Sequence, residues 1–169
     1  ALSVSGGNDT NITLEYDGSS WTAGGDLNSA RVRGFGSGTQ TAGMYSGGSL
    51  GASPYFVQTA VEQYDGSSWS SNPASLNAGQ AGYTSNNVGT SSRDTAIVAG
   101  GHAGNPASVT GVTQIYDGST WRTAPSMATA RQTSLTGDSS AALVVGGGSN
   151  TTAVEEFSAS KAVKVITDS

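Results

Sequence analysis

Few residues in this sequence have side chains that could carry out chemistry. The chain has one histidine, His102, and no cysteine, so it can form neither a thiolate site nor a multi-histidine zinc site. A hydrolytic triad would depend on His102 alone as its base, and no nucleophile motif surrounds any serine. His102 follows Gly100-Gly101, where a polar loop residue is the simpler interpretation. We therefore expect no catalytic residue, no metal site and no cofactor.

The carboxylates also lack the arrangement of a catalytic pair. Three of them recur at equivalent places in a repeated phrase, where hairpin geometry explains them: Asp17, Asp65 and Asp117. Glu155 and Glu156 are neighbours in a predicted strand and so point to opposite faces of a sheet. Residues 8–11 offer oxygen ligands but lack the regular spacing and glutamate of a calcium loop. We expect the protein not to be an enzyme.

A phrase of six residues occurs three times, and the rest of the chain is organised around it. Tyr-Asp-Gly-Ser-Ser/Thr-Trp spans residues 16–21, 64–69 and 116–121, so its Tyr positions are 48 and 52 residues apart. Asp-Gly supplies the positive φ of a hairpin turn, and the flanking aromatics favour strands. This period is typical of propeller blades. We expect the three tryptophans to occupy equivalent, largely buried positions: Trp21, Trp69 and Trp121.

Each repeat predicts the same series of strands. One buried strand ends at a double glycine, a second leads into the Tyr-Asp-Gly turn, and a third begins near the Trp. A phrase with Leu or Met, Ala and Arg then opens the innermost strand of the next unit, although Gln80 replaces the Arg once. The glycine pairs are Gly6-Gly7, Gly47-Gly48, Gly100-Gly101 and Gly146-Gly147, and the opening phrases are residues 27–31, 76–80 and 127–131. The unit is a four-stranded antiparallel sheet.

Composition supports an all-β domain. The 169 residues include 25 glycines, and only 11% are charged, which favours many turns and short strands. The hydrophobic fraction of 35% is low, so the repeats must stack to make a core. We divide one domain, residues 1–169, into repeats at about 1–26, 27–75, 76–126 and 127–169. A net charge of −5 argues against nucleic-acid binding, and no apolar run is long enough for membrane insertion.

The double glycine, the Tyr-Asp, the Trp and the Leu/Met-x-x-Ala-Arg, in this order, resemble the kelch repeat. That resemblance implies a β-propeller. Departures are Gln80 and the last repeat, in which residues 155–157 lack the Asp-Gly turn and the Trp. The copper-dependent galactose oxidases are kelch propellers whose site needs a Tyr cross-linked to Cys, and this chain has no Cys. The near-identical phrases in a charge-poor, Ser/Thr/Gly/Ala-rich chain are also similar to kelch-like virion structural proteins of tailed phages of marine bacteria.

Counting strands predicts about four blades, the first of which lacks its innermost strand. The chain offers three strands of a first blade, two full blades, and a fourth blade that ends at Ile166. The missing strand would leave an inner edge with unpaired backbone groups, which promotes association. It could come from residues upstream of Ala1 or from another chain. We favour the first source, with this chain as the C-terminal part of a larger protein.

Loop length varies mainly in one place. The Tyr lies 9 positions after Gly7 in the first repeat, 16 after Gly48 in the second and 15 after Gly101 in the third. In an up-and-down sheet this loop and the connection to the next sheet emerge on the same side, and variable loops on a rigid scaffold are the usual place for binding. We predict a binding face there, at residues 49–57 and 102–111. Its candidate residues are Pro54, Tyr55, Phe56, His102 and Asn105.

Tyr55 and Phe56 could equally begin the next strand and pack inward, in which case they belong to the core. On the binding interpretation, the resemblance implies a structural and adhesive virion protein: a tail fibre, tail appendage or capsid decoration, with another virion protein or a host-surface glycan or receptor as partner. Such a protein is located in the virion, and it could form a homo-oligomer. The alternatives are a secreted bacterial kelch-type binding module and a non-catalytic propeller part of a larger enzyme.

Overall fold

Every regular element in the described part of the chain is a β-strand. The structure, a computed structural model, describes residues 1–5, 10–50, 56–82, 92–104, 108–147 and 152–159. All strand pairs in these residues are antiparallel. None of them form a helix, so none form a helix able to cross a membrane. The predicted all-β class is confirmed.

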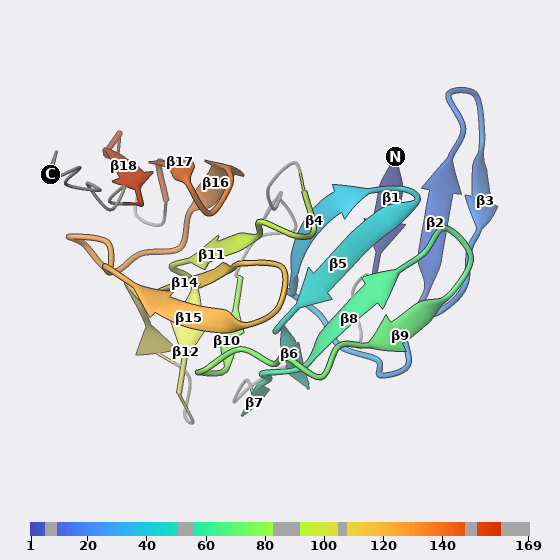
Figure 1. The fold of residues 1–169 in the computed structure, drawn as a ribbon, viewed down its shortest axis with the longest axis horizontal. Coiled ribbons are helices and arrows are strands. Elements are labelled where there is room, and N and C mark those ends of the chain that lie inside the picture. Colours follow the sequence, from blue (N-terminus) through green and yellow to red (C-terminus); the bar gives the residue numbers. More distant parts are fainter. Residues whose placement is uncertain (6–9, 51–55, 83–91, 105–107, 148–151, 160–169) are drawn as a thin grey trace, which may run out of the picture.

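Four larger sheets follow one another in chain order, one for each repeat, and we call them the first to fourth repeat sheets (Figure 1). The first contains β1 (Leu2–Val4), β2 (Thr13–Tyr16) and β3 (Trp21–Ala23). The second contains β4 (Phe35–Thr39), β5 (Ala42–Ser46), β8 (Val61–Tyr64) and β9 (Trp69–Ser71). The third contains β11 (Ile97–Ala99), β14 (Thr113–Tyr116) and β15 (Trp121–Ala124). The fourth contains β16 (Ser134–Gly137), β17 (Ala141–Val145) and β18 (Val154–Ser158).

The second repeat sheet has the predicted four antiparallel strands, in the order β4-β5-β8-β9. The first has the three strands expected of it. In the third repeat, the predicted innermost strand falls partly in residues 83–91. In the fourth repeat, the predicted last strand falls in residues 160–169. Both ranges lie outside the described residues. The strand that begins at Gln80 is β10 (Gln80–Ala81). It joins β12 (His102–Ala103) and β13 (Ser108–Val109) in a small three-stranded sheet and does not pair with β11 of the third repeat sheet.

Two short hairpins lie outside the repeat sheets, where the sequence predicted only loops. β6 (Ser49–Leu50) pairs with β7 (Phe56–Val57), and β12 (His102–Ala103) pairs with β13 (Ser108–Val109). Each hairpin starts directly after a glycine pair whose φ angles are positive, at 64° and 97° in one repeat and 69° and 82° in the other. A Cβ on Gly47 would stand 2.2 Å from the Gln80 carbonyl oxygen. The glycines therefore let the chain leave its repeat sheet and enter the hairpin without a steric clash.

In the first repeat, the position equivalent to the first glycine of the pair is Ser5 and not Gly6, the residue that the sequence predicted. Ser5 has a φ of 61°, the value that Gly47, Gly100 and Gly146 adopt at 64°, 69° and 62°. Its amide donates to the Ile12 carbonyl at 2.8 Å, just as the Gly47 amide donates to that of Ala60. Ser5 thus occupies the first glycine's position, and its hydroxyl donates to the Arg31 carbonyl oxygen. Gly6 and Gly7 lie outside the described residues.

The core lies between successive sheets, which pack on one another in the same direction along the chain. We call the face that carries the Tyr and Trp of each phrase the aromatic face, and the opposite one the acceptor face. Trp69 of the second sheet donates its Nε1–H to the Thr13 Oγ1 on the acceptor face of the first, at 2.9 Å. Trp121 of the third sheet packs in one cluster with Met44 and Val61 of the second. The aromatic faces of the second and third sheets are therefore each buried by the sheet before them.

The prediction of three equivalent, buried tryptophans is wrong for one of them. Trp69 and Trp121 are 6% and 5% exposed, whereas Trp21 is 51% exposed. Burial of the indole depends on a preceding sheet, and among the described residues no sheet lies against the aromatic face of the first. The local geometry is nevertheless the same, since the Tyr16 and Trp21 ring centroids lie 5.1 Å apart and those of Tyr64 and Trp69 lie 5.0 Å apart.

Candidate binding face

Phe56 is the candidate that the structure places most clearly on the surface. It begins β7, a hairpin strand separate from the strand β8 that leads into the Tyr-Asp-Gly turn, and its side chain is 48% exposed. The interpretation that Phe56 begins that turn strand and packs inward is therefore wrong. Its cross-strand partner in the β6–β7 hairpin is Leu50, which is 41% exposed. Directly opposed residues in an antiparallel pair have side chains on the same face. The hairpin thus presents an aliphatic and an aromatic side chain together. Pro54 and Tyr55 lie outside the described residues.

His102 lies in the second hairpin, in β12, and is half-buried. It pairs with Val109, whose side chain is 46% exposed. Burial lowers the pKa of His102, and the nearby positive charge of Arg33 lowers it further, so the imidazole is neutral at pH 7. Its Nε2 lies 3.5 Å from the Nε2 of Gln132. A neutral ring in this setting is a polar contact between repeats rather than a poised base. Asn105 lies outside the described residues.

Hydrogen bonds join the hairpins to the connections between repeat sheets. The Gln80 amide donates to the Gln58 carbonyl at 3.2 Å, directly after β7, and β10 pairs with β12. An isolated bridge joins Val32 to Ser49 in the same way one repeat earlier. The predicted side, where the long loops and the connections emerge together, is therefore a continuous hydrogen-bonded layer. We call this layer the hairpin face.

Beneath the hairpin face lies a buried polar contact that sequence reasoning missed. Arg31 of the opening phrase forms an ion pair with Glu62 of β8, and both residues are at most 2% exposed. The Arg31 Nε also donates to the Gly47 carbonyl at 2.9 Å, and the Asn28 amide donates to the other oxygen of Glu62 at 2.8 Å. The contact thus ties the opening phrase to two strands of its own sheet.

The third repeat makes the same contact with neutral side chains. Gln80 replaces the arginine, and Gln114 stands in the position of Glu62, two residues before the Tyr of the phrase. Gln114 Nε2 donates to Gln80 Oε1 at 2.8 Å, and Gln80 Nε2 donates to the Gly100 carbonyl at 2.6 Å. Both side chains are fully buried. The apparent departure at Gln80 is therefore matched by its partner.

The fourth repeat returns to the charged pair, with Arg131 and Glu155 in contact. Arg131 and then the Ala128 amide lower the pKa of Glu155 through their hydrogen bonds. In the first repeat the corresponding position holds Leu14, which is 38% exposed. The signal in the sequence was the covariation of the two positions across repeats: Arg with Glu, Gln with Gln, and Arg with Glu.

The aspartates of the phrases serve as turn residues, as predicted. Asp65 Oδ1 accepts hydrogen bonds from the amides of Ser67 and Ser68, each at 2.9 Å. Asp117 Oδ1 accepts the same hydrogen bonds from the amides of Ser119 and Thr120, at 3.0 and 2.8 Å. These hydrogen bonds lower the pKa of Asp65 and of Asp117 to about 2, and the amides of Ser68 and Thr120 have the largest effect. Because the carboxylates are occupied as acceptors within their own turns, they are poorly placed for acid/base work.

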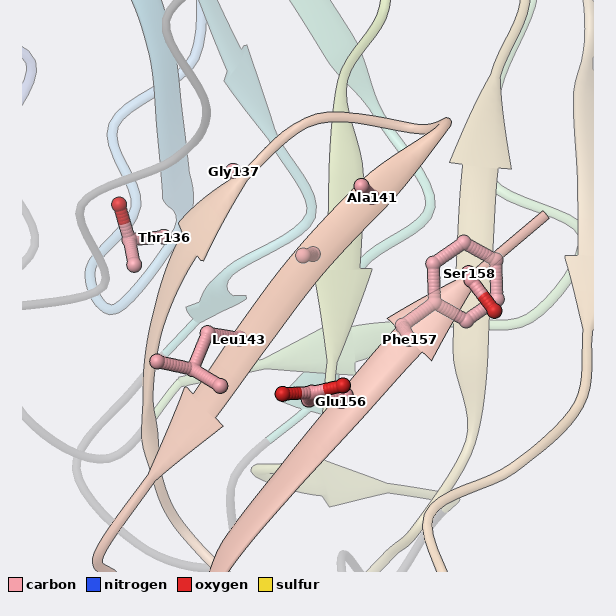
Figure 2. A pocket seen from close by; sticks show the side chains of 8 residues that line it. Thr136, Gly137, Ala141, Leu143, Glu156, Phe157 and Ser158 are labelled. Atoms are coloured by element: carbon pink, nitrogen blue, oxygen red, sulfur yellow. The ribbon is translucent and has the colours of Figure 1, made fainter.

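A hollow of about 380 Å³ lies on the acceptor face of the fourth repeat sheet (Figure 2). Thr136, Leu143 and Glu156 line it from three neighbouring strands and share one face, because each is directly paired with the next. No group of three His, Cys, Asp or Glu residues in the described part of the chain is arranged to hold a metal ion.

No protein-family model matches the chain, and no curated protein matches it.

Proposed function

We propose that the chain is a kelch-like β-propeller that serves as a non-enzymatic structural and adhesive component of a virion. In this role, as part of a tail fibre, a tail appendage or a capsid decoration, it contacts another virion protein or a host-surface glycan. The observation that carries the proposal is the pair of exposed apolar side chains, Leu50 and Phe56, on a hairpin that stands outside the repeat sheets. The virion setting rests on the resemblance of the repeated phrases.

The stacking of the sheets supports the propeller. Successive repeat sheets bury an apolar cluster at each of their three contacts, and the second sheet has four antiparallel strands in up-and-down order. A propeller arranges such sheets around an axis, so each blade needs the next for its core. The one-way packing of each aromatic face on the sheet before it suits this repetition.

The character of the hairpin face supports binding rather than catalysis. Aromatic side chains are enriched where proteins meet partners, because they bury a large area with few rotatable bonds. Phe56 and Val109 each stand on a short hydrogen-bonded hairpin, so their positions are partly fixed before a partner arrives. The single histidine is neutral and half-buried, and Asp65 and Asp117 are occupied in turns.

The test is binding of the purified chain to host-surface polysaccharides and to purified virion proteins, with Phe56→Ser as the variant. We expect affinity to fall about tenfold or more, with a melting temperature close to that of the wild type because the ring is half exposed. Trp21→Ser is the matched control, since that aromatic ring is equally exposed but lies on the first repeat sheet. Binding is measured with soluble, monovalent ligands, so that multivalency does not contribute.

Equal binding by the wild type and Phe56→Ser would refute the assignment of the hairpin face. Turnover of any glycan by the wild-type chain would refute the non-enzymatic proposal itself.

A further inference from the structure

The contact between the first and second repeat sheets joins two positions that are also present at the two exposed ends. One is the residue directly before the phrase Tyr, on the acceptor face, and the other is the Tyr of the following sheet. Glu15 accepts a hydrogen bond from the Tyr64 hydroxyl. The Tyr116 hydroxyl of the third sheet instead accepts a hydrogen bond from Asn72 of the second repeat at 3.1 Å.

At the same two positions of the third and fourth sheets stand the apolar residues Ile115 and Phe157, and Phe157 packs against the cluster that contains Ile115. The two positions thus hold Glu with Tyr in one contact and Ile with Phe in another.

Among the described residues, no sheet covers the aromatic face of the first repeat sheet. Ile12, Leu14 and Trp21 are 50%, 38% and 51% exposed. Tyr16 lies on the same face, directly opposite Trp21 in the β2–β3 pair, and its hydroxyl donates to the carbonyl of its own turn residue Gly18 at 2.8 Å. The Tyr64 hydroxyl instead reaches the neighbouring sheet. This surface therefore resembles an inter-sheet contact surface for which the described part of the chain holds no partner sheet.

No sheet in the described ranges covers the acceptor face of the fourth repeat sheet either. Val145 and Val154 are paired across β17 and β18 and are 43% and 55% exposed. Ser46 and Val61, the corresponding pair in the second sheet, are 1% and 2% exposed under Trp121 and its neighbours. The hollow lined by Leu143 and Glu156 lies on this same face (Figure 2). An aromatic side chain of a following sheet would cover this face.

We propose that the aromatic face of the first repeat sheet in one copy of the chain docks on the acceptor face of the fourth repeat sheet in a second copy. The two surfaces carry the same residue types as the contact between the first and second repeat sheets, in which Glu15 accepts from Tyr64. Glu156 stands directly before the Tyr-position residue, as Glu15 does, and the residue that would meet it is Tyr16. Val154 would lie under Trp21, as Val61 lies in the cluster with Trp121. The contact therefore repeats an interface that the chain already forms within itself.

Such a contact joins two different surfaces, so it is heterologous. Heterologous contacts close into a ring where the rotation permits and otherwise extend into a filament. Two copies bring together eight repeat sheets, which lies within the range of about 4 to 8 blades found in propellers. The proposal depends on the packing of the sheets and is independent of the virion role, because it requires no other partner.

The first test is sedimentation velocity on the purified chain, with Trp21→Glu and Val154→Glu as variants that block one end each. We expect the wild type to assemble reversibly and each variant to remain monomeric, with wild-type circular dichroism because both side chains are half exposed. An equimolar mixture of the two variants retains one intact pair of surfaces and should form dimers.

Two outcomes would overturn the proposal. One is a wild-type chain that stays monomeric up to about 0.1 mM, where a contact of micromolar Kd would be occupied. The other is assembly of Val154→Glu to the same extent as the wild type, which would mean that the aromatic face pairs with itself.

The second test isolates the polar pair. Tyr16→Phe leaves Glu156 without its donor, and Glu156→Ile leaves the Tyr16 hydroxyl without its acceptor, so each single variant should weaken assembly about tenfold. The double variant recreates the Ile115 and Phe157 combination and should recover most of the loss. Additive losses in the double variant would contradict the predicted contact between Tyr16 and Glu156.

Discussion

Replacing Arg31 and Glu62 by glutamine, singly and together, tests how the opening phrase is held to its sheet. The double variant Arg31→Gln/Glu62→Gln places in the second repeat the residues that the third repeat carries as Gln80 and Gln114. Gln80 donates to the Gly100 carbonyl, which is the counterpart of the Gly47 carbonyl bound by Arg31. The backbone in both repeats thus offers the same acceptor to either side chain.

The magnitude follows from burial. The Arg31 and Glu62 side chains are 1% and 3% exposed, so removing either partner leaves the other charge buried without compensation. Loss of one member of such a pair costs about 3 to 5 kcal/mol of unfolding free energy. A neutral pair carries no such penalty and keeps one direct hydrogen bond. We therefore expect the double variant to lose no more than about 2 kcal/mol.

The assay is urea unfolding followed by tryptophan fluorescence, for the wild type, both single variants and the double variant. The two sites are in contact, so the losses should not add, and the coupling between them should exceed about 2 kcal/mol. The Arg131→Gln variant serves as a comparison, since Glu155 is 25% exposed and water can solvate it when its partner is removed. We expect a smaller loss there. Strict additivity of the Arg31 and Glu62 losses would refute the interpretation of the two pairs as interchangeable.

Two further predictions concern the repeated phrases. Trp69→Ala should destabilise the chain by about 3 to 5 kcal/mol, because the Trp69 indole is buried. Trp21→Ala in the dilute monomer should cost less than about 1 kcal/mol, because the Trp21 indole is half exposed. Equal losses of unfolding free energy in urea would contradict the one-way packing of the sheets. The turn carboxylates should make the stability of the fold sensitive to acid. Asp65 and Asp117 have a pKa of about 2 in the folded chain, below the unfolded value of about 3.9. Their contribution to the free energy of unfolding is therefore present above about pH 4 and is lost as the pH falls toward 2. The melting temperature of the Asp65→Asn/Asp117→Asn variant should fall less over that range than that of the wild type, and an unchanged fall would contradict the role of the turns.

Much of the local structure was predictable from the sequence, because it repeats and depends on neighbouring residues. The Asp-Gly turn, the strand on each side of it, and the glycine pair at residues 47–48 are fixed by backbone preferences within a few residues. All three appear in the structure where the phrases predicted them. The kelch-like propeller itself stays a prediction.

Features that depend on distant residues were less accessible. The exposure of Trp21 could not be predicted from its phrase, which is identical to that of Trp69, because the difference lies in what packs against the sheet. Ser5 was missed because a serine with positive φ has no sequence signature as strong as the glycine pair that follows it. The buried Arg31 and Glu62 contact joins residues 31 positions apart, and only the matched change to Gln80 and Gln114 signals it.

Within the candidate site, the side of the sheets was predictable and its form was not. Loop lengths placed the long connections on one side, and the bonds from Gln80 to Gln58 and to β12 agree with that. The hairpins formed by β6 with β7 and by β12 with β13 were missed, because two-residue strands carry too few side chains to show an alternating pattern. Phe56 therefore sits in a strand and on the surface at once.

The most direct test of the proposed function is quantitative mass spectrometry of intact virus particles purified from the natural source. The proposal predicts peptides of this chain in a fixed ratio to the other structural proteins, retained through density-gradient purification of the particles. Recovery of the chain only in the particle-free fraction would contradict the virion role and would favour the secreted binding module.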